Sequence, residues 1–407
     1  MTIKPKDQIL LPRVIYGNRG DILSRWGLIN GLTAIGQDDL HLFAHQAGDL
    51  PIQMRTHFEP YGKYHNLFLS HKARSTLRNA DRILWGGGLD LTDESSKAKL
   101  LYLLATFSQY RMAGKEINCV FQGAGPLVTR TGRIVARQIL QRVSHFVARD
   151  EYTYSLIHQL NPGIPLTLAG DAIFFPGFEQ QLDLYSDAST ITHFLGNKKS
   201  PVIALNLRRW FHFSSDLVPF QLAKKRYESR GLEQMNHLMK IYIDLVQKMR
   251  SQFDARVLLV SAYNPGVYSW EDDLQWLEGV KAAFPDDHDV CLVNDSLEML
   301  DYLALMAKVD LALSMRLHTS LTVMRFGNPA VNISYSPKGV NAFCTLGMKE
   351  NAFDINSIMQ DPAPIWHRIE TILKDLHGEK EKVIRGVNTI MVTNMQALNA
   401  LFSGADD

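Results

Sequence analysis

Short apolar segments recur along the chain, and most are followed by a turn rich in glycine or aspartate and then by a helical pattern. This alternation is typical of βαβ units and predicts mainly parallel sheets. The pattern covers residues 13–175, gives way around residues 176–200 to a stretch rich in proline, glycine and serine, and restarts at residue 201. The sequence therefore predicts two α/β domains with a cleft between them and an interdomain connection at 176–200.

The predicted strands fall into two groups of five. The first group is at residues 13–17, 82–88, 117–123, 145–150 and 166–175. The second group is at residues 201–208, 255–263, 289–295, 309–315 and 329–335, with an amphipathic helix at 235–250. We expect an N-terminal domain at 1–180, a C-terminal domain at 200–375 and a closing helix at 376–407.

The composition of the 407 residues narrows the class of protein. A formal net charge of +1 gives no strongly basic domain, so nucleic acid is not an expected partner. No apolar run reaches the roughly 18 residues of a membrane span, and the N-terminus lacks the features of a signal peptide. The three cysteines have no metal-ligand spacing; Cys119 and Cys291 lie in strand-like segments and Cys344 in a loop-like one. A reducing cytoplasm and free thiols are therefore expected, without a metal site.

The segment at residues 312–338 has an unusual charge pattern. It contains Arg316, His318, Arg325 and Lys338 but no aspartate or glutamate. Arg316 and His318 lie where a predicted strand ends and a helix begins, and the positive end of a helix favours an anion. We expect an anion site whose counter-charge comes from a ligand, with Lys338 at the same sheet edge and Arg325 on the surface.

Three glycine-rich turns follow predicted strands of the first domain, where they would leave the backbone open to a ligand. In "YGNRGD", Asp21 lies at a helix start, where it either caps the helix or takes part in a site. In "WGGGLD", Asp90 is placed to orient a sugar hydroxyl. The other candidate ligand-contacting residues of these turns are Gly17, Asn18, Gly20, Gly87, Gly88, Gln122 and Gly123.

Further basic residues are candidates for ligand or lipid contact. Arg208, at the end of a strand in "NLRRWFHF", could grip a phosphate or carboxylate. The aromatic residues after it (Trp210, Phe211 and Phe213) fit either sugar stacking or an ordinary loop. Two sets with helical spacing fit either a solvated face or an anionic membrane surface, namely Arg74, Arg78 and Arg82, and Arg130, Arg133 and Arg137.

Taken in order, several segments resemble the polysaccharide pyruvyl transferases. They are "YGNRGD", "WGGG", "QGAGP", "VARDEYTYSLI", "AGDAIFF" and "SMRLHTSLTVMRFGNPAVNISYSPKGVNAF". The resemblance implies two Rossmann-like domains facing a cleft, as in GT-B glycosyltransferases. It also implies transfer of pyruvate from phosphoenolpyruvate to sugar hydroxyls of a surface polysaccharide or its lipid-linked precursor, forming a ketal.

The resemblance assigns the Arg-Leu-His motif, Arg316, Leu317 and His318, to phosphoenolpyruvate, with Arg208 as a further anion ligand. Histidine suits a general acid near neutral pH, so we assign that role to His318, while Asp21 and Asp90 remain alternative bases. The reaction needs no metal or cofactor besides phosphoenolpyruvate as co-substrate. The expected location is cytoplasmic, with peripheral contact at the inner membrane face as an option.

Two other functions fit the pattern. One is a GT-B glycosyltransferase that uses a nucleotide sugar. Retaining enzymes of that kind often carry a glutamate after the strand that corresponds to residues 309–315, and residues 314–338 contain no carboxylate. The other is a non-catalytic subunit of polysaccharide assembly, against which the presence of both Arg316 and His318 argues.

Overall fold

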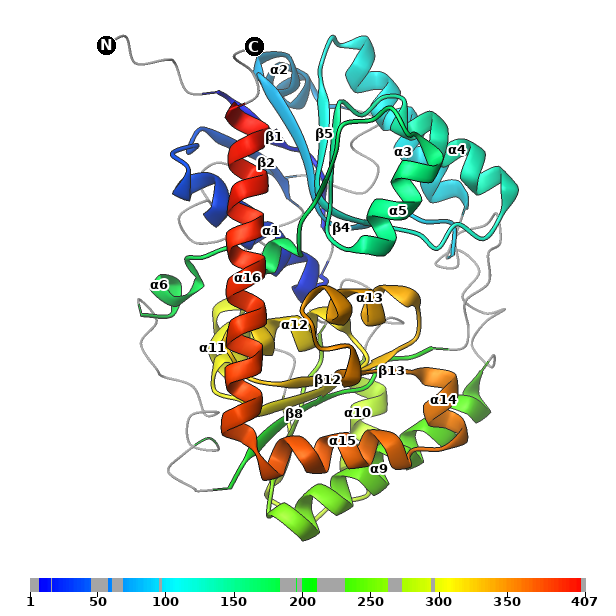
Figure 1. Ribbon diagram of the computed structural model, residues 1–407, viewed down its shortest axis with the longest axis vertical. Coiled ribbons are helices and arrows are strands. Elements are labelled where there is room, and N and C mark those ends of the chain that lie inside the picture. The colour runs from blue at the N-terminus through cyan, green and yellow to red at the C-terminus, as the bar shows by residue number, and fades with distance from the viewer. Residues whose placement is uncertain are drawn as a thin grey trace.

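The computed structural model describes residues 7–15, 17–44, 58–60, 69–94, 97–183, 195, 200–210, 231–262, 273–293 and 297–403. Two parallel sheets are stacked end to end with helices around them (Figure 1). None of the helices in these ranges has the length and apolar character needed to cross a membrane.

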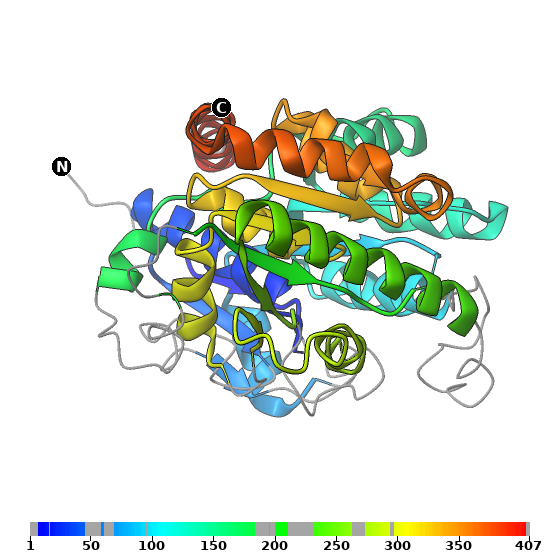
Figure 2. The ribbon, with the colours of Figure 1, turned by 90° about the horizontal axis from the view of Figure 1, so that it is seen from below.

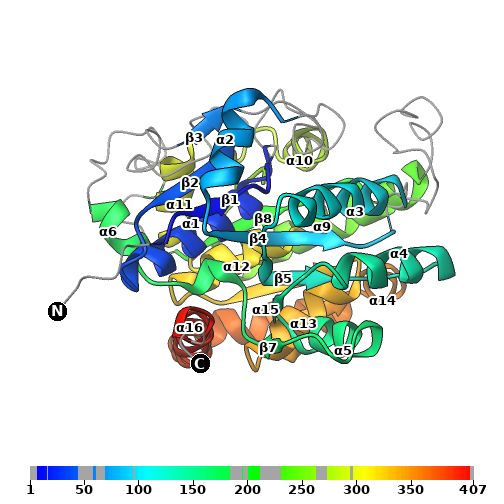
Figure 3. The ribbon, with the colours of Figure 1, turned by 90° about the horizontal axis from the view of Figure 1, so that it is seen from above.

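In the described part of the N-terminal half, seven strands form one sheet in the order β3-β2-β1-β4-β5-β6-β7. The strands are β1 (Ile9–Leu11), β2 (Leu40–Ala44), β3 (Phe58–Pro60), β4 (Arg82–Leu91), β5 (Ile117–Ala124), β6 (His145–Ala148) and β7 (Leu166–Leu168). The helices are α1 (Arg19–Ala34), α2 (His71–Asn79), α3 (Lys97–Met112), α4 (Arg130–Leu140), α5 (Glu151–Leu160), η3 (Ala172–Phe174) and α6 (Phe178–Asp183). Figure 3 shows α1 on one side of this sheet and α3, α4 and α5 on the other.

In the described part of the C-terminal half, six strands pair in the order β10-β9-β8-β11-β12-β13. The strands are β8 (Val202–Asn206), β9 (Arg256–Leu259), β10 (Val290–Leu292), β11 (Leu311–Ser314), β12 (Ala330–Ser334) and β13 (Ala352–Asp354). The helices are α9 (Leu232–Phe253), α10 (Leu274–Lys281), α11 (Met299–Ala307), α12 (Leu317–Arg325), α13 (Pro337–Thr345), η5 (Lys349–Asn351), α14 (Ile355–Gln360), α15 (Ala363–Lys374) and α16 (Leu376–Ser403).

Alternate residues of β8 face two different cores. Ile203 and Leu205 pack with α9, α10, α14 and α15, whereas Val202 and Ala204 pack toward α11, α12 and α16. Figure 2 shows α9 and α15 lying across the first of these faces. A strand buried on both faces reads as a continuous apolar run, which explains why "VIAL" predicted a central strand.

The predicted α/β fold with two parallel sheets is confirmed. Several details differ. The first strand is Ile9–Leu11 rather than residues 13–17, and only Leu166–Leu168 of the segment 166–175 is a strand. Cys344, expected in a loop, lies in α13. Strands β2, β3 and β13 were not predicted; β3 and β13 have three residues each, too few for the alternation that identifies a strand from sequence.

The two halves are joined by contacts at the start of α1 and along α16. The Arg19 guanidinium donates to the carbonyl oxygens of Ser261 and Leu297 in the C-terminal half. Helix α16 runs along both sheets (Figure 1), and its Asn394 bonds with the backbone of Gly170 and Asp171. These bonds hold the carboxyl edge of the first sheet against the second, where the candidate site lies.

Candidate active site

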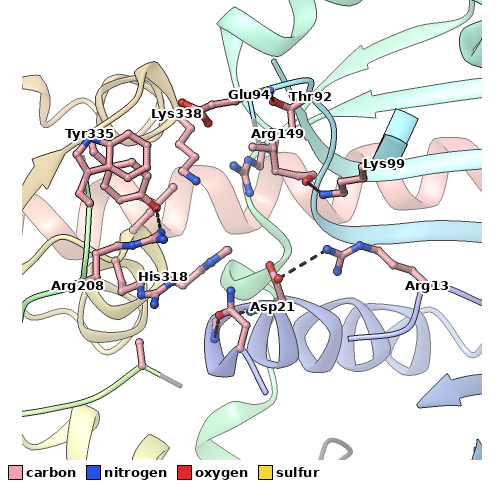
Figure 4. Close-up of a pocket in the computed structure, with 17 residues that line it drawn as sticks. Arg13, Asp21, Thr92, Glu94, Lys99, Arg149, Arg208, His318, Tyr335 and Lys338 are labelled. Carbon is pink, nitrogen blue, oxygen red and sulfur yellow. Dashed lines mark hydrogen bonds and ion pairs between the residues drawn. The ribbon is translucent and has the colours of Figure 1, made fainter. Parts of the chain in front are cut away.

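A cavity of about 250 Å³ lies between the carboxyl edges of the two sheets. Its charged residues from the N-terminal half are Arg13, Asp21, Glu94, Lys99 and Arg149, and Asn18 and Gly20 also line it. From the C-terminal half it is lined by Arg208, Trp210, Arg316, His318, Tyr335 and Lys338, together with Leu317. Figure 4 shows these side chains converging from both halves. The cavity thus brings the start of α1 and the Arg-Leu-His segment together.

His318 lies in the first turn of α12 and contacts two buried groups of the N-terminal half. Its Nε2 atom is 3.2 Å from the Ser24 hydroxyl on α1 and 3.3 Å from Asp171 Oδ2. Ser24 in turn donates to Asp171 Oδ1 over 2.6 Å. These contacts fix the plane of the imidazole while its side chain stays 14% exposed to the cavity.

The Asp171 carboxylate stays charged despite its burial. Burial alone would raise its pKa, but His318 and then Arg149, at 3.2 Å, hold the pKa of this carboxyl well below its usual range. The charged Asp171 therefore holds the imidazole of His318 from the protein side, away from the cavity.

The interpretation that the cations of residues 312–338 lack carboxylate partners is wrong for Arg316 and Arg325. The Arg316 guanidinium lies 2.7 Å from Asp273, whose side chain is fully buried. Arg325 is not on the surface: its side chain is 4% exposed and its Nη1 lies 2.7 Å from Glu179. Both carboxylates come from outside the segment, so its local sequence cannot reveal them.

Arg208 and Lys338 surround the ring of Tyr335 on the C-terminal side of the cavity. Arg208 donates to the Tyr335 hydroxyl over 2.7 Å, and the Lys338 ammonium lies 4.8 Å from the ring centre. Lys338 forms no ion pair with any residue that the structure describes. Burial would raise the pKa of Tyr335, but the charges of Arg208 and Lys338 outweigh burial and lower it to about 8. A phenol with a lowered pKa reports a strongly positive environment.

On the N-terminal side, Arg13 is held by the carboxylate of Asp90. The two side chains are 2.6 Å apart, and Asp90 also accepts from Trp85 and lies 3.1 Å from Lys99. Burial would raise the pKa of Asp90, but Arg13 and Lys99 hold it well below its usual range. Asp90 does not line the cavity. Its contacts make it a positioning group for two cations rather than an accessible base.

Two glycines of these turns, Gly88 and Gly123, make room for an arginine side chain. A Cβ at Gly88 would lie 2.2 Å from the Arg13 guanidinium, and one at Gly123 would lie 2.7 Å from Nε of Arg149. Both arginines line the cavity, whereas Gly17, Gly87, Gly88, Gln122 and Gly123 do not. Asn18 rather than Asp21 caps α1, because its side chain accepts from the backbone nitrogens of Gly20 and Asp21. Asp21 instead points to Arg13, 3.7 Å away (Figure 4).

Several residues of the site had not been singled out from the sequence. Arg149 directly follows a strand, and Tyr335 follows another, so the rule that ligands lie at strand ends could have found both. Asp171 and Glu94 lie in loops without a comparable signal. The aromatic residues Phe211 and Phe213 lie outside the described residues, as do residues 184–194 of the predicted connection. The described residues contain no group of three or more His, Cys, Asp or Glu placed to hold a metal ion.

Comparison with solved structures finds chains with a similar fold along almost the whole length. UDP-GlcNAc 2-epimerase from Neisseria meningitidis, solved with UDP-GlcNAc bound, is 14% identical with a TM-score of 0.57, over 97% of this chain and 99% of that chain. A trehalose 6-phosphate synthase from Burkholderia multivorans is 8% identical with a TM-score of 0.56, over 97% of this chain and 98% of that chain. At these identities the likeness shows the GT-B-like fold alone.

Comparison of sequences is more specific. Amylovoran biosynthesis protein AmsJ from Erwinia amylovora is 22% identical over 346 residues, which are 83% of this chain and 77% of that protein. The sequence pattern of the family described as polysaccharide pyruvyl transferase matches residues 18–337, from the cap of α1 to the start of α13. This match includes residues of both walls of the cavity, with Arg13 and Lys338 just outside it. The chain belongs to the polysaccharide pyruvyl transferase family.

Proposed function

We propose that the protein transfers the pyruvyl group of phosphoenolpyruvate to two hydroxyls of a sugar, forming a ketal on a surface polysaccharide or its lipid-linked precursor. The observation that carries the proposal is the arrangement of Arg208 and Lys338 around Tyr335, on the same wall of the cavity as His318. Phosphoenolpyruvate carries a phosphate and a carboxylate on three carbons. Such a compact anion matches a cavity that presents several cations within a short span.

In this proposal Arg208 and Lys338 bind the anionic groups of the donor, and the backbone at the start of α12 adds its positive end. Arg316 stays in its ion pair with Asp273 and presents its guanidinium edge to the donor. The same cations stabilise the negative charge that develops on the departing phosphate. Leu317, Asn18 and Gly20 shape the cavity beside the donor.

His318 is the proposed general acid. It donates a proton to C3 of phosphoenolpyruvate, which makes C2 electrophilic, and an acceptor hydroxyl then adds at C2. The C2–O bond to phosphate breaks, and a second hydroxyl closes the ketal. Asp171 and Ser24 hold the imidazole during this step. Asp21 lines the cavity and remains a candidate contact for the acceptor.

The N-terminal half, which we assign to the acceptor, also offers a surface for membrane contact. Such a surface fits a lipid-linked acceptor. Arg130, Arg133 and Arg137 are exposed on one face of α4 with Ile134, which is 64% exposed, and Val128 precedes them at 66%. Basic and apolar groups on one helix face suit an anionic bilayer. The other predicted set, Arg74, Arg78 and Arg82, does not form one helix face, because Arg82 belongs to β4 and pairs with Asp7. The three free thiols agree with a reducing cytoplasm.

The test is to incubate the purified protein with phosphoenolpyruvate and a panel of lipid-linked saccharides and synthetic pyranosides. We expect phosphate release that depends on the acceptor, and a product heavier by one pyruvyl ketal in mass spectrometry. Sugar transfer from a parallel panel of nucleotide sugars would instead support a glycosyltransferase. Binding of phosphoenolpyruvate without any transfer would support a non-catalytic subunit.

A further inference from the structure

The carboxylates around the cavity differ in how they are bonded. Asp90 is bonded to Arg13, Asp171 to Arg149 and His318, and Asp273 to Arg316. Each is buried and has a cation as a fixed partner. To accept a proton from a substrate, each would have to give up its partner, at a cost of several kcal/mol for a buried pair.

The carboxylates of Asp93 and Asp21 also have bonding partners. Asp93 accepts from the backbone nitrogens of Val128 and Thr129 and from the Thr129 hydroxyl, so it holds the start of α4. Asp21 lies 3.7 Å from Arg13, and its side chain is 21% exposed. Asp21 would therefore have to leave its ion pair in order to act as a base.

Glu94 is different from all of these. It follows β4, lines the cavity, and its carboxylate makes no hydrogen bond or ion pair with any described residue. Figure 4 shows it on the same side of the cavity as Lys338. Burial raises the pKa of Glu94, and the charges of Lys338 and Arg208 oppose this increase only in part. A carboxylate with a raised pKa is a better proton acceptor near neutral pH.

We infer that Glu94 is the general base that removes the proton from the attacking hydroxyl of the acceptor. The inference rests on the proposed pyruvyl transfer and names the catalytic group that this function leaves open. Glu94 comes from the N-terminal half and lies on the same side of the cavity as Lys338, one of the cations that we assign to the donor. A sugar between the two walls would place its hydroxyl between Glu94 and C2 of phosphoenolpyruvate.

The protons balance over one turnover. In the addition, the hydroxyl O–H bond breaks toward Glu94, the new O–C2 bond forms, and the C2=C3 electron pair takes the proton of His318. In the closing step, protonated Glu94 gives its proton to the phosphate as the C2–O bond breaks. The second hydroxyl then attacks C2 and loses its proton to neutral His318. Glu94 and His318 return to their starting states, and one hydroxyl proton is carried off by phosphate.

The experiment compares Glu94→Gln with Glu278→Gln, the same change at an exposed position of α10. With the best acceptor of the panel, or with water as acceptor, we expect Glu94→Gln to lower turnover by about 10²- to 10⁴-fold. Its affinity for phosphoenolpyruvate, measured by calorimetry, should stay equal or increase, because a negative charge near Lys338 is removed. Glu278→Gln should match the wild type in both measurements. Circular dichroism verifies folding, and Glu94→Asp should retain part of the activity.

The pH profile supplies a second readout that a purely structural role would not change. The groups facing Glu94 are Lys338 on α13, Arg208 after β8, Tyr152 on α5 and its neighbour Asp93. Because Glu94 must be ionised to act, wild-type kcat/KM should fall on the acidic side as Glu94 takes up a proton. That acidic limb should be absent from the residual activity of Glu94→Gln.

The outcomes separate the two proposals. If the wild type transfers pyruvate and Glu94→Gln does so within about twofold, the assignment of Glu94 is wrong and the proposed function stands. If Asp21→Asn removes transfer while Glu94→Gln retains it, Asp21 is the base and the inference is again wrong. If the wild type releases no phosphate with any acceptor or with water, the proposed function fails and the inference fails with it.

Discussion

The two walls of the cavity both carry cations but differ in their carboxylates; the cations of the N-terminal wall are Arg13, Lys99 and Arg149. Among the described residues that line it, both carboxylates, Asp21 and Glu94, come from the N-terminal half. The C-terminal wall contributes Arg208, Arg316 and Lys338 with His318, and no carboxylate among its described residues. In the proposed function this difference becomes a division of labour, in which the C-terminal wall binds the anionic donor and the N-terminal wall receives protons.

Buried aspartates hold the basic side chains of the C-terminal wall from behind and do not line the cavity themselves. Asp273 and Asp171 lie behind Arg316 and His318, with side-chain exposures of 0% and 4%. They orient the cationic groups from the protein side and leave the cavity side to a ligand. Orientation by groups behind the contacting side chain is the usual means by which a site is kept in its productive geometry.

The largest expected effect tests the proton donor. His318→Ala should lower turnover by about 10²- to 10⁴-fold, because the acid that protonates C3 is lost. Affinity for phosphoenolpyruvate should change only a few-fold, since Arg208 and Lys338 remain. Steady-state kinetics and calorimetry measure the two quantities, with His377→Ala, whose side chain is 90% exposed, as the matched control. Turnover at the wild-type level would remove His318 from the chemistry.

A second prediction compares Arg316 with Arg325, the other paired arginine of residues 312–338. Arg316→Met leaves the fully buried Asp273 without its cation and should lower the free energy of unfolding by about 3–5 kcal/mol. Arg325→Met should cost less, because its partner Glu179 is 57% exposed and can return to water. Urea denaturation measures both. Equal costs would contradict the view that Arg316 is anchored by a buried partner.

The smallest expected effect concerns the ionisation of Tyr335. Its pKa is about 8 in the folded protein against an ordinary value of 10. The folded state therefore favours the phenolate, and relative to Tyr335→Phe the wild type should gain stability as pH rises from 8 to 10, and lose this gain as pH falls through 8. Near-ultraviolet absorbance of the phenolate follows the titration.

Phosphoenolpyruvate should shift this titration upward, because its negative charges offset Arg208 and Lys338. An unchanged titration on saturation with the donor would place the anion away from the C-terminal wall. An identical absorbance change in Tyr335→Phe would show that another tyrosine is being observed.

The sequence was sufficient for the fold and for half of the site. Continuous apolar strands followed by helices identify both sheets, and the Arg-Leu-His segment marks the cavity because it lies where a strand ends and a helix begins. Short-range patterns carry this information. Strands β2, β3 and β13 were missed, and two of them, β3 and β13, have only three residues each.

The pairing of charges could not be predicted because it depends on contacts between distant parts of the chain. Arg316 meets Asp273 across 43 positions, and Arg13 meets Asp90 across 77. A segment without carboxylates therefore looked unpaired although two of its arginines are paired. The glycine turns were interpreted as ligand contacts for the same reason, since only the fold shows that Arg13 and Arg149 occupy the space beside Gly88 and Gly123.

The division between the two walls is tested most directly by calorimetric titration of phosphoenolpyruvate into the wild type, the double variant Arg208→Met/Lys338→Met and Glu94→Gln. We predict that the double variant loses at least about 100-fold in affinity, because charge-assisted hydrogen bonds contribute about 1.5–3 kcal/mol each. Glu94→Gln should bind the donor at least as tightly as the wild type. Donor binding that survives in the double variant and weakens in Glu94→Gln would contradict the account.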